Sequence, residues 1–290
     1  PLSCSPENIP HPGPHHPHGN GENRTVCPGS IKRMTPPVLF LLFNRPDLAD
    51  RVFSTIRAAR PGQLFIAVDG PRSSREGEEE LVSQNRAFAD RVDWPCEVHT
   101  LFRDANMGCG PALSEAITWF FDHVESGIIL EDDCLPELSF FHFASEILER
   151  YADNEEVMMV NGTSYIPKMD DREDSYYFSV FGNIWGWASW RRAWARYDYE
   201  LSDWPANVAV QQQLQRFGPL AKWHINRNFR LSKIGVINTW DYQWEHAIWA
   251  SGGIAVTPFC NLVTNLGFDE RATHTSKGDD GRAERTRTPL

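Results

Sequence analysis

The feature that most restricts the fold of this chain is a set of short, uninterrupted apolar runs separated by segments with helical periodicity. Runs this short do not make ordinary helices and are typical of strands buried on both faces. After the first run, apolar side chains recur at helical spacing from Leu48 to Ala59, and Pro61 ends that segment. The alternation predicts an α/β fold with a mostly parallel sheet and helices on both faces. The expected strands lie at 38–43, 64–68, 96–102, 128–130 and 157–160.

The chain is long enough for one substantial domain. It has 290 residues, of which 41% are hydrophobic. Residues 1–35 are rich in Pro, Gly and His and show no apolar periodicity, so we expect a disordered tail there. We assign 36–275 to a single domain and 276–290, which are charged, to a frayed C-terminal tail.

Charge and composition restrict the partners. A formal charge of -11 disfavours a nucleic-acid or anionic-membrane surface as partner, because phosphate binding requires a basic face. No apolar run is long enough to predict a transmembrane segment. The six cysteines form no C-x-x-C pair and have no regular spacing, which fits a reducing compartment. These features predict a cytoplasmic protein, with peripheral membrane association left open.

Three consecutive acids, Glu131, Asp132 and Asp133, end the apolar run 128–130. Adjacent carboxylates repel one another, so a divalent metal or a set of donors must offset the repulsion. In open α/β sheets ligands bind beyond the carboxyl ends of the strands, where these acids fall. The triplet therefore predicts a site for a metal such as Mn²⁺ or Mg²⁺. The alternative is a solvated acidic turn that caps the next helix.

A second stretch, from Asn238 to Trp249, places carboxylates among tryptophans. Thr239 or Asn238 can cap a helix here, which puts Asp241 in the first turn and Glu245 one turn further on the same face. Apolar surroundings raise the pKa of a carboxylate and make it a better general base. An acid pair at this spacing is also common at a solvated helix edge.

Three other segments are candidate binding elements. The glycine-bearing loop Arg103–Pro111 opens onto a helix and is expected to offer free backbone N–H groups to an anion. Gly186 lies between Trp185 and Trp187, which indicates either close approach to a ligand or an aromatic corner of the core. A loop ending in His274 could contact a phosphate or a metal, although a lone loop histidine is more often neither.

The acidic triplet in its setting and the pattern Trp240-Asp-x-x-Trp244 resemble motifs of nucleotide-sugar glycosyltransferases with the GT-A fold. The likeness is to the N-acetylglucosaminyltransferase I type and extends over residues 36–275. It implies that Asp133 holds the metal at the diphosphate, that Asp132 faces the ribose or the metal, and that Glu131 orients the pocket.

The same resemblance assigns roles to residues outside the triplet. Asp241 matches the catalytic base, with Glu245 as the alternative because Tyr242 stands where the family has a second acid. Arg45 and Asp69 match the positions that hold the base and ribose of the nucleotide; otherwise Asp69 caps a turn and Arg45 lies at the surface.

A Gly-Trp at the acceptor side of the pocket corresponds here to Trp187, and His274 is a candidate metal or phosphate partner. The implied enzyme is an inverting hexosyl- or N-acetylhexosaminyl-transferase. It would move a sugar from a nucleotide-diphospho-sugar, with a UDP-sugar favoured, to a glycan or another acceptor hydroxyl. The alternatives are a sugar nucleotidyltransferase and a non-catalytic carbohydrate-binding module.

Overall fold

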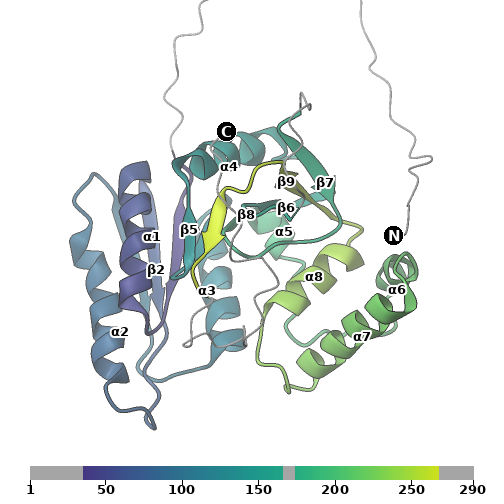
Figure 1. The fold of residues 1–290 in the computed structure, drawn as a ribbon, viewed down its shortest axis with the longest axis horizontal. Coiled ribbons are helices and arrows are strands. Elements are labelled where there is room, and N and C mark those ends of the chain that lie inside the picture. The colour runs from purple at the N-terminus through teal and green to yellow at the C-terminus, as the bar shows by residue number, and fades with distance from the viewer. Residues whose placement is uncertain (1–34, 166–173, 268–290) are drawn as a thin grey trace, which may run out of the picture. The chain divides into compact units, whose positions relative to one another are not determined.

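The computed structural model describes residues 35–165 and 174–267, which contain an eight-stranded sheet of order β3-β2-β1-β4-β8-β6-β9-β7 (Figure 1). Four adjacent strands are parallel: β1 (Val38–Leu42), β2 (Gln63–Val68), β3 (Glu97–Phe102) and β4 (Ser126–Glu131). The next strand, β8 (Trp187–Trp190), is antiparallel to both of its neighbours, β4 and β6 (Val157–Asn161). Beyond β6 lie β9 (Ile254–Pro258), which is parallel to it, and β7 (Tyr176–Ser179), which is antiparallel to β9. The prediction of a mostly parallel sheet is confirmed.

The continuous apolar runs arise because the central strands are covered on both faces. Every residue of β1 is buried. Val38 and Phe40 pack into one hydrophobic cluster, whereas Leu39 and Leu41 pack into another on the opposite face. Successive strand side chains point to opposite faces, so a strand with two buried faces has no polar positions.

Helices form a layer on each face of the sheet, as predicted (Figure 1). One layer contains α1 (Pro46–Ala59), α2 (Glu78–Arg86), the short 3₁₀ helix η1 (Ala87–Arg91) and α4 (Leu138–Arg150). The other contains α3 (Cys109–His123), α5 (Arg191–Trp194), α6 (Val208–Gln215), α7 (Pro219–Lys233) and α8 (Asp241–Ala250).

A group of tryptophans forms much of the second cluster. Trp187, Trp240 and Trp244 are at most 1% exposed. The ring of Trp187 stacks 5.6 Å from that of Trp240 and lies 5.9 Å from that of Trp244. The segment from Trp187 is strand β8, and the following helix is a single short turn that begins at Arg191.

A second, two-stranded sheet forms beside the end of β4. β5 (Cys134–Pro136) pairs antiparallel with β10 (Val263–Asn265). Beyond the pair, the Leu266 N–H donates to the Asp133 carbonyl at 2.8 Å. This pairing brings the segment after β10 against the acidic triplet.

The predicted tails at 1–35 and 276–290 lie almost entirely outside the described residues, and so does His274. Their assignments therefore stay predictions. Within 35–165 and 174–267, no helix combines the length and apolar character needed to cross a membrane.

Candidate functional site

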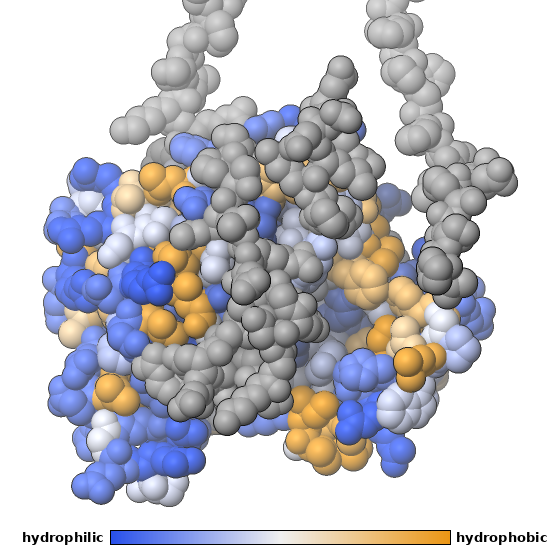
Figure 2. Space-filling model, in the orientation of Figure 1, coloured by the Kyte–Doolittle hydropathy of each residue, from blue (hydrophilic) through white to orange (hydrophobic). Residues whose placement is uncertain are grey.

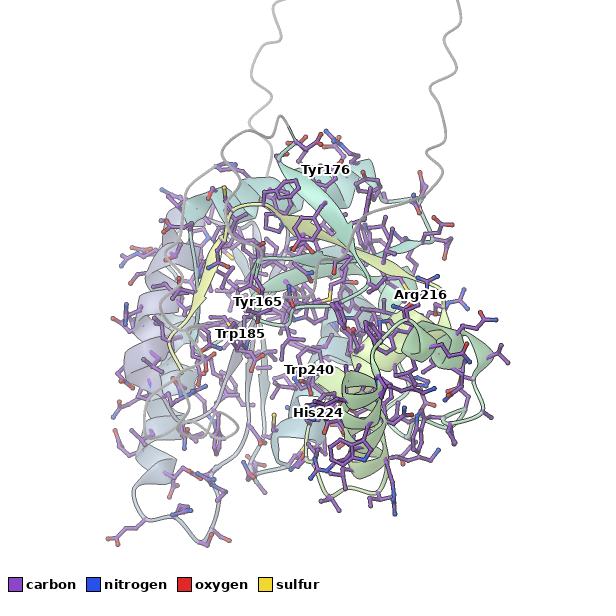
Figure 3. The ribbon with its side chains drawn as sticks, turned by 45° about the vertical axis from the view of Figure 1, so that its right-hand side comes forward. Tyr165, Tyr176, Trp185, Arg216, His224 and Trp240 are labelled. Carbon is purple, nitrogen blue, oxygen red and sulfur yellow. The ribbon has the colours of Figure 1, made fainter. Side chains whose placement is uncertain are left out.

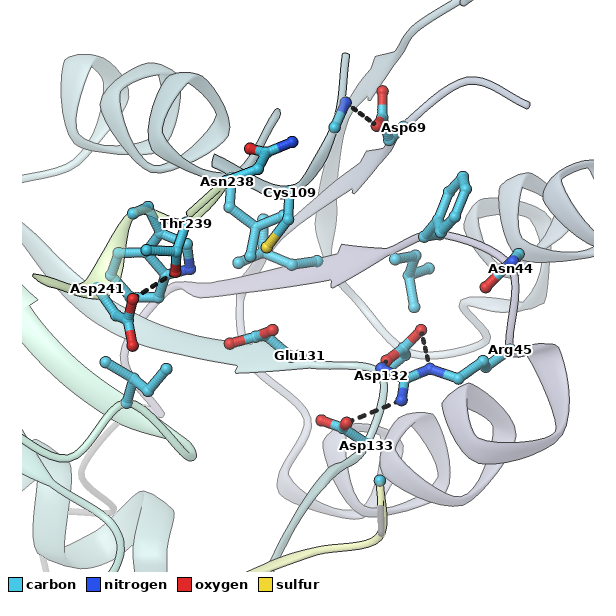
Figure 4. Close-up of a pocket in the computed structure, with 18 of the residues that line it drawn as sticks. Asn44, Arg45, Asp69, Cys109, Glu131, Asp132, Asp133, Asn238, Thr239 and Asp241 are labelled. Carbon is cyan, nitrogen blue, oxygen red and sulfur yellow. Dashed lines mark hydrogen bonds and ion pairs between the residues drawn. The ribbon is translucent and has the colours of Figure 1, made fainter. Parts of the chain in front are cut away.

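A cavity of about 550 Å³ lies at the carboxyl ends of the parallel strands (Figure 4). Its wall combines apolar side chains with acids, two arginines and several amides. Ligand sites of this size and position are common in open α/β proteins. Six of the predicted site residues line it: Arg45, Asp69, Glu131, Asp132, Asp133 and Asp241.

Arg45 provides the positive charge beside the acidic triplet (Figure 4). It follows β1, which is the parallel neighbour of β4, with Leu41 paired to Glu131. Its guanidinium forms an ion pair with Asp132 and lies 3.0 Å from Asp133, measured from Nη1 to Oδ2. The repulsion that the sequence predicts is therefore offset in part by a side chain of the protein.

Burial dominates the electrostatics of this cluster. It raises the pKa of Glu131 well above its ordinary value, and the charges of Asp133 and Asp132 raise it further. Burial also raises the pKa of Asp132 to about 7, although the guanidinium of Arg45 opposes the shift. Burial alone would lower the pKa of Arg45, but the negative charges of Asp132 and Asp133 outweigh it and raise that pKa.

The donor atoms at this end fit a divalent cation that is shared with a bound ligand. Among the described residues, no three His, Cys, Asp or Glu side chains are grouped so as to hold a metal by themselves. Asp132 and Asp133 supply hard carboxylate oxygens, and Mg²⁺ commonly binds through one or two carboxylates together with substrate phosphates. Gly267 leaves room for the Asp133 carboxylate, since a Cβ at Gly267 would lie 2.1 Å from its Oδ2.

Asp241 lies on the side of the site opposite Asp132 and Asp133, and Glu131 lies between them (Figure 4). It is the first residue of α8, and it is half-buried. The Thr239 hydroxyl donates a hydrogen bond to its Oδ1. The Asn238 Oδ1 accepts a bond of 2.8 Å from the backbone N–H of Gly110, which ties the start of α8 to the start of α3.

Glu245 does not belong to the cavity wall. Its Oε2 accepts a bond of 2.9 Å from the backbone N–H of Gly182. Burial raises its pKa to about 8. The structure therefore separates the two acids that the sequence places on one helix face, because the side chain of Glu245 is directed to the loop after β7.

Trp187, the predicted acceptor-side residue, also lies away from the cavity. It is fully buried in the tryptophan group, and Trp185 lines the cavity instead. The rings of Trp185 and Tyr165 meet edge to face, with centroids 5.9 Å apart (Figure 3). Residues two apart in a strand point to the same face of a sheet. Trp185, however, lies before β8, and Gly186 has a positive φ of 63° that turns the chain between Trp185 and Trp187.

Asp69 holds the glycine-bearing loop, which corrects the expectation that this loop offers free N–H groups to a ligand. The Asp69 carboxylate accepts bonds from the backbone N–H groups of Gly70, Met107 and Gly108 and from the Asn106 side chain. Burial raises the pKa of Asp69, while the three backbone donors and the charge of Arg103 act in the opposite direction. The anion bound by these backbone groups is thus an aspartate of the chain itself.

Sequence reasoning missed a polar group at the ends of β1 and β2. Arg72 pairs with the buried Glu78, and the Asn44 amide donates to Glu78 Oε1 at 2.9 Å. The Arg72 guanidinium also lies 5.2 Å from the centre of the Phe43 ring. Asn44 and Arg72 both line the cavity and both follow a strand end, so the rule that located the triplet could have found them.

No protein-family model matches the chain, and a comparison with curated proteins finds no relative. Among solved structures, one similar chain is a mannosyltransferase from Pyrobaculum calidifontis in complex with GDP-Man and Mn²⁺. The two share 17% identity and a TM-score of 0.31 over 48% of this chain, which spans only 38% of the mannosyltransferase. A UDP-glucose pyrophosphorylase complexed with UDP-glucose is 11% identical, with a TM-score of 0.36 over 78% of this chain and 90% of that one. Likenesses this weak carry no argument, so function has to be inferred from the site.

Proposed function

We propose that this chain is a metal-dependent, inverting glycosyltransferase of the GT-A type that moves a sugar from a nucleotide-diphosphate donor to an acceptor hydroxyl. One observation carries the proposal. The acids that end β4, the arginine that follows β1 and the aspartate that begins α8 all face a single cavity. Their sequence separation is large, so only the fold brings them together.

The acidic end would receive the diphosphate of the donor. Asp133 and Asp132 would hold Mn²⁺ or Mg²⁺ together with the phosphate oxygens, and Arg45 would stay paired to the carboxylates. When bound, such a cation neutralises the charge that develops on the leaving diphosphate. A cavity of about 550 Å³ suits a ligand of nucleotide-sugar size. A UDP-sugar with a hexosyl or N-acetylhexosaminyl group is the favoured donor on the sequence resemblance.

Asp241 would act as the general base. Its bond from Thr239 fixes the orientation of the carboxylate. Inversion requires the acceptor oxygen to attack the sugar carbon from the side opposite the leaving group. A base at one end of the site and the diphosphate at the other meet that requirement (Figure 4). Asp241 would take the hydroxyl proton as the new bond to the sugar carbon forms and the bond to the diphosphate breaks.

The proposal is tested by donor binding and transfer. We would titrate UDP- and GDP-sugars by calorimetry with Mn²⁺ and with a chelator, and follow transfer to simple glycosides by mass spectrometry. Asp133→Asn should lose the metal-dependent part of nucleotide binding. Asp90→Asn, which removes the same charge from an exposed position on η1, should retain it.

Three results would redirect the assignment. Unchanged Mn²⁺-dependent binding by the Asp133→Asn variant would contradict the metal site. Release of pyrophosphate from a nucleoside triphosphate and a sugar 1-phosphate would identify a nucleotidyltransferase. Binding of glycans without any nucleotide would identify a binding module.

A further inference from the structure

The chain contains a long acid-free segment with a strong local positive charge. Residues 204–240 include five Lys and Arg residues and neither Asp nor Glu. Because the whole chain has a formal charge of -11, these five cations leave the remainder at -16. We call this segment, which contains α6 and α7, the basic arm. The arm packs beside α8, as Figure 1 shows. Its cations are Arg216, Lys222, Arg227, Arg230 and Lys233.

The outer face of α7 combines large apolar side chains with arginines. Leu220, Trp223 and Ile234 are 79%, 61% and 58% exposed, and Arg227 and Arg230 are exposed as well. These positions fall at helical spacing, so they form one stripe along the helix. The opposite side of α7 is buried in the second hydrophobic cluster. The helix is therefore anchored on one side and presents an amphipathic stripe on the other.

The ends of the two helices extend the exposed apolar surface. Val208, at the start of α6, is 68% exposed, and Val236, after α7, is 65% exposed. With the three apolar residues of the stripe, they are the five most exposed large apolar side chains in the described part of the chain. Figure 2 shows orange side chains beside blue ones over the region where Figure 1 places α6 and α7. Single exposed apolar residues are ordinary, but a gathered set marks an interaction surface.

We propose that the basic arm docks on an anionic lipid surface. A helix face that mixes Trp, Leu and Ile with Arg suits the boundary between headgroups and acyl chains, where the apolar side chains enter and the guanidinium groups meet lipid phosphates. Charge complementarity selects this partner. The arm is attracted to an anionic surface while the acidic remainder of the chain is repelled, so the molecule is oriented with the arm toward the lipid.

Under this proposal the local charge of the basic arm, rather than the net charge of the chain, decides whether the protein meets an anionic surface. Exposed charges are screened beyond about 8 to 10 Å at ordinary salt, so a surface responds to the face that touches it. Three of the cations in the arm, Arg216, Arg227 and Arg230, are exposed. The Lys233 ammonium, in contrast, donates to the carbonyls of Leu201 and Trp204, so it is already engaged within the protein.

The test is sedimentation of the full chain with lipid vesicles. At low salt the protein should cosediment with vesicles of phosphatidylcholine and phosphatidylglycerol, and it should not cosediment with vesicles of phosphatidylcholine alone. One Arg near an anionic surface contributes roughly fivefold in affinity, so Arg227→Gln with Arg230→Gln should weaken binding roughly 25-fold. Leu220→Gln with Trp223→Gln should weaken it as well, by removing the apolar contact.

A matched control removes the same charge elsewhere. Arg51→Gln with Arg75→Gln changes two exposed arginines outside the arm and should leave vesicle binding unchanged. Melting temperatures of all variants check that each is folded. Equal binding by wild type and the Arg227/Arg230 variant, or equal binding to neutral vesicles, would overturn the proposal. So would a lipid-free dimer that the Leu220/Trp223 variant breaks, because the occupant of the face would then be a second copy of the chain.

Discussion

At the scale of single residues, Arg45 offsets the negative charge of Asp132 and Asp133, a role that the sequence did not predict. Its side chain is 18% exposed, and that of its partner Asp132 is 4% exposed. Removing one partner of a buried pair leaves the other charge without compensation. Arg45→Ala should therefore lower the free energy of unfolding by about 3 to 5 kcal/mol. Mn²⁺ should restore part of the lost melting temperature, because it can replace the missing positive charge.

Arg57 offers the matched control for Arg45. It also pairs with an aspartate, Asp93, but both side chains are about half exposed. Exposed pairs contribute little to stability, so Arg57→Ala should melt close to wild type, with or without Mn²⁺. Equal losses of melting temperature in the two variants would show that the Arg45 pair behaves as a surface pair.

Asp241 is the residue on which the proposed reaction depends most directly. Loss of a general base typically costs about 10²- to 10⁴-fold in rate. Asp241→Asn should lower kcat by that order and leave donor affinity nearly unchanged, because the donor binds at the acidic end. Glu245→Gln should keep most of the activity, since Glu245 lies off the cavity wall. Loss of activity in the Glu245 variant alone would exchange the two roles.

Glu245 also predicts a pH dependence of stability. Its pKa in the folded state is about 8, against an ordinary 4.5, so the folded chain retains a proton that the unfolded chain releases. The stabilisation is fully present below pH 4.5 and is lost as pH rises through 8. A glutamine side chain cannot ionise, and its oxygen can still accept the hydrogen bond from the backbone N–H of Gly182. As pH rises from 4.5 to 8, the melting temperature of Glu245→Gln should therefore rise relative to that of wild type. An unchanged difference between the two melting temperatures over this range would contradict the raised pKa of Glu245.

At the scale of elements, local patterns were sufficient wherever a strand is buried on both faces. The apolar runs at β1 and β4 predicted those strands, and the acids that follow β4 predicted the cavity edge. The pattern at the start of α8 placed Asp241 correctly in a first turn, but the predicted cap is wrong, because Trp240 and not Thr239 or Asn238 occupies the cap position. In each case the property that decides the structure, apolarity or helical spacing, lies within a few neighbouring residues.

Features set by distant contacts could not be predicted from the sequence. Trp187 became a strand residue because β8 pairs with both β4 and β6, which lie far from each other in the chain. The role of Asp69 depends on a loop 38 residues away, and the bond between Gly110 and Asn238 joins residues 128 apart. Periodicity contains no information on which distant segment an amide or carboxylate will meet.

The contact between the starts of α3 and α8 should be sensitive to an added methyl group. A Cβ at Gly110 would lie 2.5 Å from the Tyr199 hydroxyl and 2.8 Å from the Thr239 carbonyl. Overpacking of this kind costs about 1 to 3 kcal/mol. Gly110→Ala should therefore lower the melting temperature, and it should also lower kcat because Thr239 orients Asp241.

Gly218, at the start of α7, is the control for Gly110. A Cβ there meets nothing within 4 Å, and its φ of -62° is open to alanine. Gly218→Ala should leave both the melting temperature and kcat near wild type. A Gly110→Ala variant with a wild-type profile would show that the two helix starts can separate without consequence for the site.

At the scale of the whole molecule, the site should bind its metal and its nucleotide as a coupled pair. The described residues contain no group of three metal-binding side chains, and Arg45 contacts both Asp132 and Asp133. Oxygens of the ligand would have to complete the coordination. Mn²⁺ alone should therefore bind weakly, and a nucleoside diphosphate should strengthen its binding.

Thermodynamic reciprocity makes this coupling testable without any assay of transfer. The factor by which the diphosphate strengthens Mn²⁺ binding must equal the factor by which Mn²⁺ strengthens diphosphate binding. Calorimetry in both orders, corrected for the complex that the two ligands form in solution, measures the two factors independently. Asp133→Asn should reduce both factors toward one, because it removes a carboxylate that the shared cation would contact, while Asp90→Asn should change neither. Equal Mn²⁺ affinity with and without the nucleotide would mean that the cation binds elsewhere on the chain, and the coordination proposed at β4 would then be wrong.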